Sequence, residues 1–534
     1  MRKIIIPLLA LLLAVPFAGE AQRAGQKPKL VVNIVVSQLR YDWLAKFQDN
    51  LSEEGFVRFA TTGMNFSSAY YNYMQTLSPV SLATLTTGVN PSMHGVVATS
   101  WIDYVTGDRV SLIDDRSVQG LNCDPGTGRY SRQNIVMPTL GDKLLSESPQ
   151  SKVVSIAANP VSAIVMGGQT GTAYWMDYSR AVWISSTCFM NRLPDWLVKY
   201  NDTRPANYYV GMGWTPARSS KQYISKVNTI FDGDRGNRIS SFKNGNTSDY
   251  NALLRTPWGN TLVADFAKQV VLNEKLGADD DTDVLNICFD ASRYVGETYG
   301  SESMELEDML YRLDLDLAAL VKAITAQVPV HDVLFVVTSD HGMSDSWDQG
   351  PAAQDRFNVN QFKTILNSFL GVQFGAGDWV IDYIDRQVYL NHNLIYRKNL
   401  SLEEVQNRAA TFVLQFRGVS HVLTSIAMSN GYFGASYGHR MQNGFYPRRA
   451  GDLMLNLMPG WIEERAGVRS LPGSMYDYDT HVPLIVFGWK IPARNVAEPV
   501  DMTWVAPTLA RIMQISRPTA SDGITLRDME VILR

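Results

Sequence analysis

The chain has 534 residues, of which 45% are hydrophobic and 19% are charged, and this composition excludes a disordered chain and a coiled coil. The length exceeds the ~100–200 residues of an ordinary domain, so it predicts one enlarged domain or several domains. The formal net charge is −4, because 48 basic residues stand against 52 acidic ones, and no basic excess indicates nucleic acid as a partner.

The first residues have the pattern of a targeting segment. Arg2 and Lys3 precede an apolar run over residues 4–17, and the small residues Gly19 and Ala21 follow. This order is typical of a secretory signal peptide. The alternative is an uncleaved membrane anchor, which the run disfavours because it is shorter than the ~20 residues that span a membrane. We therefore expect residues 1–21 to be removed, the mature chain to carry no transmembrane segment, and the protein to be periplasmic or otherwise exported.

Three cysteines, Cys123, Cys188 and Cys288, match no metal-binding spacing. In an oxidising compartment they allow one disulfide and leave one thiol over, and the sequence does not fix the pairing. Cys288 lies within an apolar run and is predicted to be a core residue.

Apolar runs alternate with helical patterns along the chain. Nearly continuous runs, which indicate strands covered on both faces, lie at residues 30–36, 153–156, 284–289, 333–337 and 484–487. Helical spacing of apolar residues covers 306–324, and a capping-box start at Ser401 opens a second helical pattern over 401–416. This alternation predicts an α/β fold around a mainly parallel sheet.

Residues 346–440 have the character of an insertion, because they are richer in Gln, Asn and Gly and carry strand and helix signals of their own. Such an insertion either caps a functional site or decorates the fold. The main sheet is expected to resume near residues 451–455. The predicted organisation is a signal peptide over 1–21, a core over 22–345, a cap over 346–440 and the C-terminal part of the core over 441–534.

Seven short strings resemble, in order, motifs of the alkaline phosphatase superfamily. They lie at residues 86–95, 173–177, 294–296, 313–316, 339–342, 443–447 and 478–484. The likeness is to the bacterial periplasmic phosphate-monoesterase branch, which is related to the nucleotide pyrophosphatases/phosphodiesterases. It implies an alkaline-phosphatase-like sandwich with a mainly parallel central sheet and a capping insertion. It also implies hydrolysis of phosphate esters by a Thr or Ser nucleophile between two zinc ions, which three Asp and three His hold.

The metal positions that this resemblance implies are only half retained. They hold Asp340, His341 and His481, which match the family, and Ser37, Arg293 and Glu297, which replace Asp, Asp and His. A guanidinium stays protonated and cannot ligate a metal, so Arg293 opposes metal binding. Because catalytic zinc normally has three protein ligands, we expect no zinc or one weakly bound zinc ion, with Glu297 and Ser78 as weak further ligands.

The resemblance places Ser78 at the position of the nucleophile. A serine can attack phosphorus, but a serine followed by Pro79 at a helix start is also an ordinary N-cap. The Asn that contacts phosphate in the family is Thr99 here, and the Lys and Arg that grip phosphate in the monoesterase branch are Asn159 and Val161. Both of these phosphate-binding cations are therefore substituted.

Arg293 is predicted to form a direct charge-assisted pair with Asp340, because the resemblance places both positions on one pocket. Glu297 follows Arg293 by one helical turn and is expected to share the guanidinium. Three further carboxylates are candidates for relocated metal ligands: Asp345, Asp348 and Asp355.

Two principal hypotheses about function follow from these substitutions. The first is an exported, degenerate member (a pseudoenzyme) that acts by binding a small anionic ligand or an envelope protein partner. The alternative is an active zinc-dependent phosphomonoesterase or phosphodiesterase, with Ser78 as nucleophile and a reduced metal site. Zinc content measured beside activity on an aryl phosphate distinguishes the two.

Overall fold

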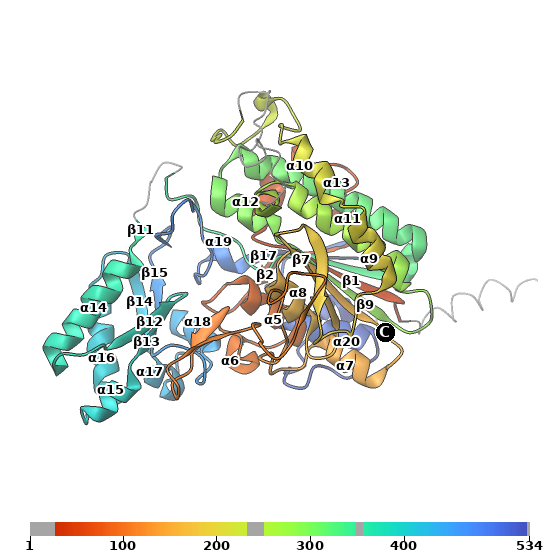
Figure 1. Ribbon diagram of the computed structural model, residues 1–534. Coiled ribbons are helices and arrows are strands. Elements are labelled where there is room, and N and C mark those ends of the chain that lie inside the picture. The colour runs from red at the N-terminus through yellow and green to blue at the C-terminus, as the bar shows by residue number, and fades with distance from the viewer. Residues whose placement is uncertain (1–26, 232–249, 349–355, 531–534) are drawn as a thin grey trace, which may run out of the picture.

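The computed structural model describes residues 27–231, 250–348 and 356–530. In these ranges a large core is built on an eleven-stranded sheet, and a smaller lobe lies beside it (Figure 1). The predicted signal peptide, residues 1–21, lies outside the described residues. Within the described ranges, no helix combines the length and the apolar character that crossing a membrane requires.

The middle of the main sheet is parallel and its two sides are mixed. The parallel strands, in spatial order, are β10 (Val333–Thr338), β1 (Leu30–Val36), β9 (Asp283–Phe289), β6 (Val153–Ala157) and β7 (Thr172–Asp177). Beyond β10 lie β17 (His481–Gly488), β2 (Met64–Tyr70), β18 (Arg494–Val496) and β19 (Val500–Asp501), and beyond β7 lie β8 (Val182–Ser186) and β5 (Gly120–Leu121). The predicted α/β fold with a mainly parallel sheet is confirmed, although β17 runs antiparallel to β10.

Helices cover both faces of this sheet, which explains the unbroken apolar runs of its strands. Along β1, Val32 and Ile34 pack into the hydrophobic core on one face, while Val31 and Val35 pack into the core on the other. The first face carries α4 (Phe56–Thr62), α11 (Trp258–Glu274) and α13 (Met304–Gln327), and the second carries α5 (Ser78–Thr87), α7 (Leu140–Glu147), α8 (Pro160–Gly167) and α20 (Val505–Ile512). Figure 1 shows α11 and α13 above the sheet and α7 and α20 below it.

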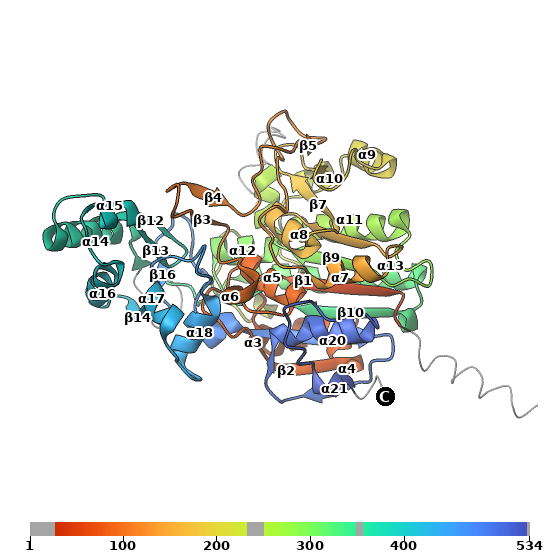
Figure 2. The same cartoon turned by 90° about the horizontal axis from the view of Figure 1, so that it is seen from below.

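The smaller lobe is the predicted cap, with a sheet and a hydrophobic core of its own (Figure 2). Its strands, in spatial order, are β12 (Val380–Ile384), β13 (Gln387–Leu390), β15 (Leu453–Leu457) and β14 (Val419–Thr424). Its helices are α14 (Val359–Phe374), α15 (His392–Arg397), α16 (Leu402–Val413), α17 (Ser425–Asn430) and α18 (Tyr437–Gly444).

The structure moves the end of the cap beyond residue 440. The run at residues 453–457, expected to return to the main sheet, is β15, which pairs with β13 and β14 inside the cap. The chain returns to the main sheet only at β17. The expected resumption near residues 451–455 is therefore wrong.

Buried polar contacts hold the cap against the core. The hydroxyl of Tyr104 donates to the carboxylate of Asp452 at 3.1 Å, and Asp452 is 1% exposed. Arg449 lies at the end of the cap, and its Nη1 donates to the carbonyl oxygen of Gly95 at 2.8 Å. Charge-assisted hydrogen bonds of this kind are stronger than neutral ones, so they fix the position of the cap beside the core.

The remaining elements are short, and several of them border the site. They are α3 (Tyr41–Lys46), α6 (Pro91–His94), β3 (Ser100–Ile102), β4 (Arg109–Ser111), α9 (Asp195–Asp202), α10 (Ala206–Met212), α12 (Ala291–Tyr299), β11 (Arg356–Phe357), β16 (Ile462–Glu463), α19 (Asp477–Thr480) and α21 (Arg527–Glu530). Cys123, Cys188 and Cys288 are all free thiols, and the prediction that Cys288 is a core residue is confirmed by its complete burial.

Candidate functional site

Most of the predicted site residues meet at the carboxyl end of the parallel strands. Ser37 follows β1, and Asp340 and His341 follow β10, so neighbouring parallel strands deliver these side chains to one edge of the sheet. Ser78 is the first residue of α5 and Leu77 is its N-cap, so the interpretation of Ser78 as an N-cap is wrong. Arg293 lies on α12. A cavity of ≈ 160 Å³ opens here, and its lining includes Ser78, Thr99, Arg293, Glu297 and His341.

Both oxygens of the Asp340 carboxylate accept hydrogen bonds from groups of the protein. Its Oδ2 accepts a hydrogen bond from Ser37 Oγ at 2.7 Å. Its Oδ1 accepts from the backbone N–H groups of Gln38 at 3.0 Å and His341 at 2.8 Å. The side chain is 0% exposed, and these three donors satisfy its two oxygens by hydrogen bonds.

His341 and Ser78 form a buried hydrogen-bonded pair. His341 Nδ1 lies 2.7 Å from the carbonyl oxygen of Gly342, which only accepts, so Nδ1 carries the ring proton. Burial lowers the pKa of His341, which keeps the ring neutral and leaves Nε2 as an acceptor. Nε2 lies 3.1 Å from Ser78 Oγ, so the Ser78 hydroxyl donates to it.

Arg293 also lines the cavity, and like His341 it contacts Ser78. Its Nη1 donates to Ser78 Oγ at 3.2 Å, and its Nη2 donates to the Tyr294 hydroxyl at 3.0 Å, with the guanidinium carbon 4.8 Å from the Tyr294 ring centre. Burial works to lower the pKa of Arg293, but the neighbouring Tyr294, Glu297, Asp290 and Asp340 raise it above its ordinary value. Arg293 is therefore a fixed cation beside the candidate nucleophile.

The predicted direct pair between Arg293 and Asp340 is wrong. Ser37 and two backbone N–H groups take up the Asp340 carboxylate, and in the described ranges no ion pair joins it to Arg293. Arg293 Nε instead lies 3.9 Å from Glu297 Oε1, one helical turn further along α12. The expectation that Glu297 shares the guanidinium therefore agrees with the structure, as a long contact.

The substituted phosphate-binding positions have structural roles. Asn159 caps α8, because its Oδ1 accepts from the backbone N–H of Val161 at 2.9 Å, and its Nδ2 donates to the Tyr294 hydroxyl at 3.0 Å. The Val161 side chain packs against the hydrophobic core. Thr99 lines the cavity. None of these three residues supplies a positive charge there.

His481 lies apart from the other retained residues. Its ring stacks between Tyr41 and Tyr70, with ring centres 4.4 and 4.5 Å away. Its Nε2 donates to the carbonyl oxygen of Ser67 at 2.9 Å. These contacts hold His481 beside Tyr70 of β2 and Tyr41 of α3, and among the described residues it forms no metal-binding group with Asp340 and His341.

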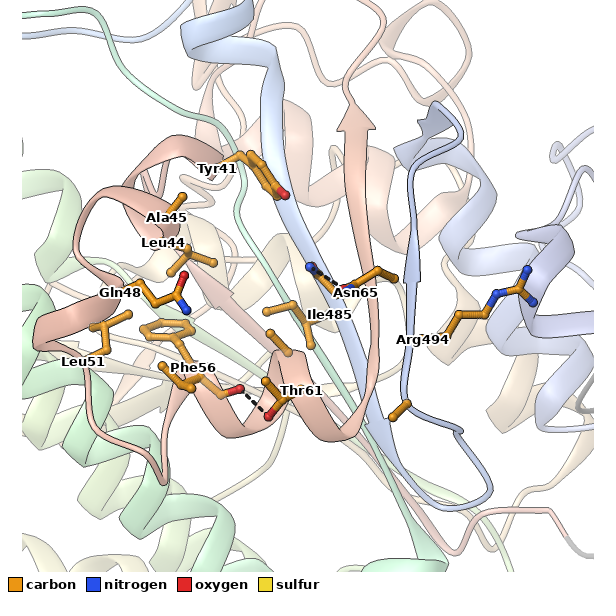
Figure 3. Close-up of a pocket in the computed structure, with 14 residues that line it drawn as sticks. Tyr41, Leu44, Ala45, Gln48, Leu51, Phe56, Thr61, Asn65, Ile485 and Arg494 are labelled. Atoms are coloured by element: carbon orange, nitrogen blue, oxygen red, sulfur yellow. Dashed lines mark hydrogen bonds between the residues drawn. The ribbon is translucent and has the colours of Figure 1, made fainter.

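Tyr41 also borders a second hollow, an open groove of ≈ 530 Å³ between α3, α4 and the edge of the main sheet (Figure 3). Leu44, Phe56 and Ile485 give it an apolar floor, and Arg494 lies at its edge. The lining of this groove contains no carboxylate or imidazole. It is larger than the cavity at Ser78, but it lacks the groups for metal or acid–base chemistry.

Several residues of the cavity were missed by the sequence reasoning. The cap contributes Asp385, Arg386, Glu463 and Arg465, and the segment before α19 contributes Leu471, Pro472 and Gly473. One signal was available for the first two, because Asp385 and Arg386 separate two short apolar strands in the way a hairpin turn does. No sequence signal marks Pro472 as facing the cavity.

Of the carboxylates suggested as relocated metal ligands, Asp345 and Asp348 do not line the cavity. Asp345 pairs with Arg40 at 2.6 Å and is 63% exposed. Asp348 pairs with Arg469 at 3.2 Å. Asp355 lies outside the described residues.

The donor groups at the cavity do not fit a zinc centre. In the ranges that the structure describes, no three His, Cys, Asp or Glu side chains gather as a metal-binding group. Both Asp340 oxygens are taken by N–H and O–H donors, and the Arg293 cation points at Ser78. A tightly bound catalytic zinc would need three such ligands and no cation among them.

Comparison with known proteins gives the family. The model of the type I phosphodiesterase / nucleotide pyrophosphatase family matches residues 31–469. Alkaline phosphatase PafA of Elizabethkingia meningoseptica is 29% identical over 518 residues, which cover 95% of each chain. Alkaline phosphatase PhoV of Synechococcus elongatus is 27% identical over 521 residues, which cover 94% of this chain and 93% of PhoV.

Solved structures agree with this assignment. The crystal structure of wild-type PafA matches with a TM-score of 0.87 at 27% identity, covering 94% of this chain and 99% of PafA. A PafA variant with four substitutions matches with a TM-score of 0.88 over the same share of both chains. The family model covers far more than half of the sequence, and the fold agrees from end to end. The chain therefore belongs to the type I phosphodiesterase / nucleotide pyrophosphatase family, within the alkaline phosphatase superfamily.

Proposed function

We propose that this protein is an exported, phosphatase-like pseudoenzyme that binds a small charged ligand in the cavity at Ser78. The observation that carries the proposal is the position of Arg293, whose guanidinium donates to Ser78 Oγ at 3.2 Å. In this position a protein cation lies beside the nucleophile, where the family chemistry calls for metal cations. Such a cation excludes a second positive charge by repulsion and holds anionic groups by hydrogen bonds.

The substitutions in a PafA variant involve the same residue types that differ in this chain. In that variant a threonine is replaced by serine, and an asparagine, a lysine and an arginine are each replaced by alanine. The same residue types are the ones that the resemblance places at Ser78, Thr99, Asn159 and Val161, so this chain carries the serine and lacks the other three. At these four positions the natural chain therefore resembles the engineered PafA variant, because both have the serine and both lack the asparagine, the lysine and the arginine.

The test of the proposal is hydrolysis with zinc supplied. We expect the purified protein, in excess zinc, to hydrolyse 4-nitrophenyl phosphate and bis(4-nitrophenyl) phosphate no faster than its Ser78→Ala variant. The matched variant removes the candidate nucleophile and leaves the cavity otherwise intact, so it measures the background of the preparation. Zinc-dependent turnover that disappears in Ser78→Ala would overturn the proposal.

A second candidate function is hydrolysis through Ser78 itself. The observation that favours it is the 3.1 Å separation of Ser78 Oγ and His341 Nε2, with the ring proton fixed on Nδ1 by Gly342. A neutral imidazole in this tautomer can accept the proton of an attacking hydroxyl. Turnover of either aryl phosphate that needs both Ser78 and His341, and that the Ser78→Ala variant lacks, would favour this candidate.

Export is the other element of the proposal. It rests on Arg2, Lys3 and the apolar run that follows them. N-terminal sequencing of the mature protein is expected to begin near residue 22; a membrane-bound chain that still begins at Met1 would refute it. An envelope protein partner stays a prediction, and a pulldown that returns a stoichiometric partner would favour it over a small ligand.

A further inference from the structure

The turn between β12 and β13 carries two charged residues into the cavity. Asp385 and Arg386 are the two central residues of this hairpin, and both have positive φ, at 45° and 65°. A two-residue turn with positive φ at both positions favours Asn, Asp or Gly, and an arginine there is strained. The conformation of the turn therefore does not account for an arginine at position 386.

The Arg386 side chain is buried with hydrogen-bonding capacity to spare. The residue is 4% exposed, and its Nη1 is buried without a hydrogen-bond partner. Its Nη2 makes only a long contact, 3.4 Å, to the carbonyl oxygen of Pro472. A buried guanidinium N–H without a partner is costly, and this one belongs to a side chain that lines the cavity. It is available to an anionic ligand.

The charges around the cavity balance. Its lining holds three arginines, Arg293, Arg386 and Arg465, and three carboxylates, Glu297, Asp385 and Glu463. The three carboxylates would repel a phosphate, or another anion without a positive group, that bound at Arg386.

The three carboxylates differ in the hydrogen bonds and ion pairs that they already form. Glu463 accepts from Arg465 at 2.6 Å and from the Tyr383 hydroxyl at 2.9 Å, and Asp385 faces Arg465 at 3.5 Å. Among the described residues, Glu297 has no such hydrogen bond, only the 3.9 Å contact with Arg293 Nε. The cavity therefore presents a free guanidinium N–H on Arg386 and a free carboxylate on Glu297.

We propose that the cavity binds a small zwitterion, whose anionic group is held by Arg386 and whose ammonium group is held by Glu297. The inference rests on the proposed function, because a two-zinc centre would need the same space. The volume of ≈ 160 Å³ limits the ligand to a molecule of about amino-acid size. The hairpin turn of the cap thus supplies the specificity that distinguishes this cavity from a phosphate site.

Matched pairs of probes test the ligand class by calorimetry. β-Alanine is compared with propionate, and aminomethylphosphonate with methylphosphonate, so that each pair differs in the ammonium group. We expect at least one zwitterion to bind 10-fold or more tightly than its ammonium-free partner, and inorganic phosphate to bind weakly. Equal or weaker binding of both zwitterions would overturn the inference. Failure of the proposed function would be seen separately, as zinc-dependent hydrolysis of the aryl phosphates.

Two substitutions test the assigned residues. Arg386→Gly removes the guanidinium and suits the positive φ of 65°, so it should fold well and weaken binding of the preferred zwitterion 10-fold or more. Glu297→Gln should abolish the preference for the zwitterion over its ammonium-free partner. Arg58→Gln, at a position whose side chain is 58% exposed on α4, is the control and should bind as the wild type does. Unchanged binding in Arg386→Gly, or an unchanged preference in Glu297→Gln, would overturn the inference.

Discussion

The two sides of the cavity differ in how fully the protein satisfies their polar groups. On the retained side, Asp340 accepts from three donors and the neutral His341 ring is bonded at both nitrogens. On the substituted side, Arg293 Nε is buried without a hydrogen-bond partner and lies 3.9 Å from the Glu297 carboxylate. Asp340 and His341 are hydrogen-bonded within the protein, whereas Arg293 Nε is a buried donor that no acceptor satisfies.

This difference teaches that retained residues are not by themselves a retained function. Asp340 and His341 match the family ligands, yet their contacts are those of a structural hydrogen-bond network. Arg293 Nε and Arg386 Nη1, by contrast, are buried donors without a partner, and Glu297 has only a long contact with Arg293. Removing Asp340 should therefore cost more stability than removing Arg293.

The largest effect is expected for Asp340→Ala. The substitution takes the acceptor from the Ser37 hydroxyl and the Gln38 N–H, and it leaves the His341 N–H only its longer bond to Ser339 Oγ at 3.3 Å. At ~1–3 kcal/mol for each unsatisfied buried donor, the loss in free energy of unfolding should be about 3 kcal/mol or more. Urea unfolding with a chelator present measures it, and Asp340→Asn, which keeps one acceptor oxygen, should lose less. A loss below about 1 kcal/mol would contradict the account.

A smaller effect is expected for Arg293→Met. This change removes hydrogen bonds to Ser78 and Tyr294, but it also removes a buried charge that is only partly paired, so the net cost at pH 5 should be about 1 kcal/mol. Arg293→Lys is the matched control, because it keeps the charge and loses the planar guanidinium. A loss equal to that of Asp340→Ala would show that the two sides do not differ.

The cost of Arg293→Met should grow with pH. Burial raises the pKa of Asp290 to about 6, against the opposing effect of Arg293. The folded protein then holds a proton that the unfolded chain releases above its pKa of about 3.9, so stability falls as the pH rises through this window. Without Arg293 the pKa of Asp290 rises further and the window extends above pH 6. Urea unfolding at pH 5 and pH 8 should show a wider gap at pH 8; equal gaps would refute the coupling.

The smallest effect is expected for His481→Gln. The imidazole lies between two tyrosine rings outside the cavity, and glutamine can keep a donor near Ser67, so the loss of stacking should cost about 0.5–1 kcal/mol. Zinc uptake and ligand binding should not change. Tyr41→Leu, which removes one stacking partner, should have a similar effect on unfolding. A change in zinc content caused by His481→Gln would place the residue in the site.

The core of the fold could be predicted from the sequence, because strands buried on both faces contain no polar alternation. The run at residues 30–36 is β1 without a shift, and the helix expected over 306–324 is the middle of α13. The end of the cap could not be predicted in the same way. The run at 453–457 is as apolar as a core strand, and one sequence does not state which sheet a buried strand joins.

The site could be predicted only where residues follow core strands. The structure brings Ser37, Asp340 and His341 into contact, because the ends of neighbouring parallel strands meet at one edge. His481 also adjoins a strand, but its tyrosine neighbours on β2 and α3 hold it elsewhere. Arg386 and Pro472 come to the cavity from distant segments by tertiary packing, which leaves no local pattern to read.

The placement of His481 also changes how a metal site could be rebuilt. Ser37→Asp, Arg293→Asp and Glu297→His add donors to those of Asp340 and His341, but His481 cannot complete the set from its position between two tyrosines. Pro472 lines the cavity, so Pro472→His is expected to supply the missing imidazole. The triple variant should therefore bind less zinc than the quadruple variant that also carries Pro472→His.

Zinc content per chain is the measurement that tests the central claim most directly. The wild type and the quadruple variant are equilibrated with excess zinc, desalted together and analysed by inductively coupled plasma mass spectrometry. The account predicts well below one zinc ion per wild-type chain and about two in the quadruple variant, whose donors match a two-metal site. Two zinc ions in the wild type, lost on Asp340→Asn, would contradict the claim that Arg293 has replaced the metal centre.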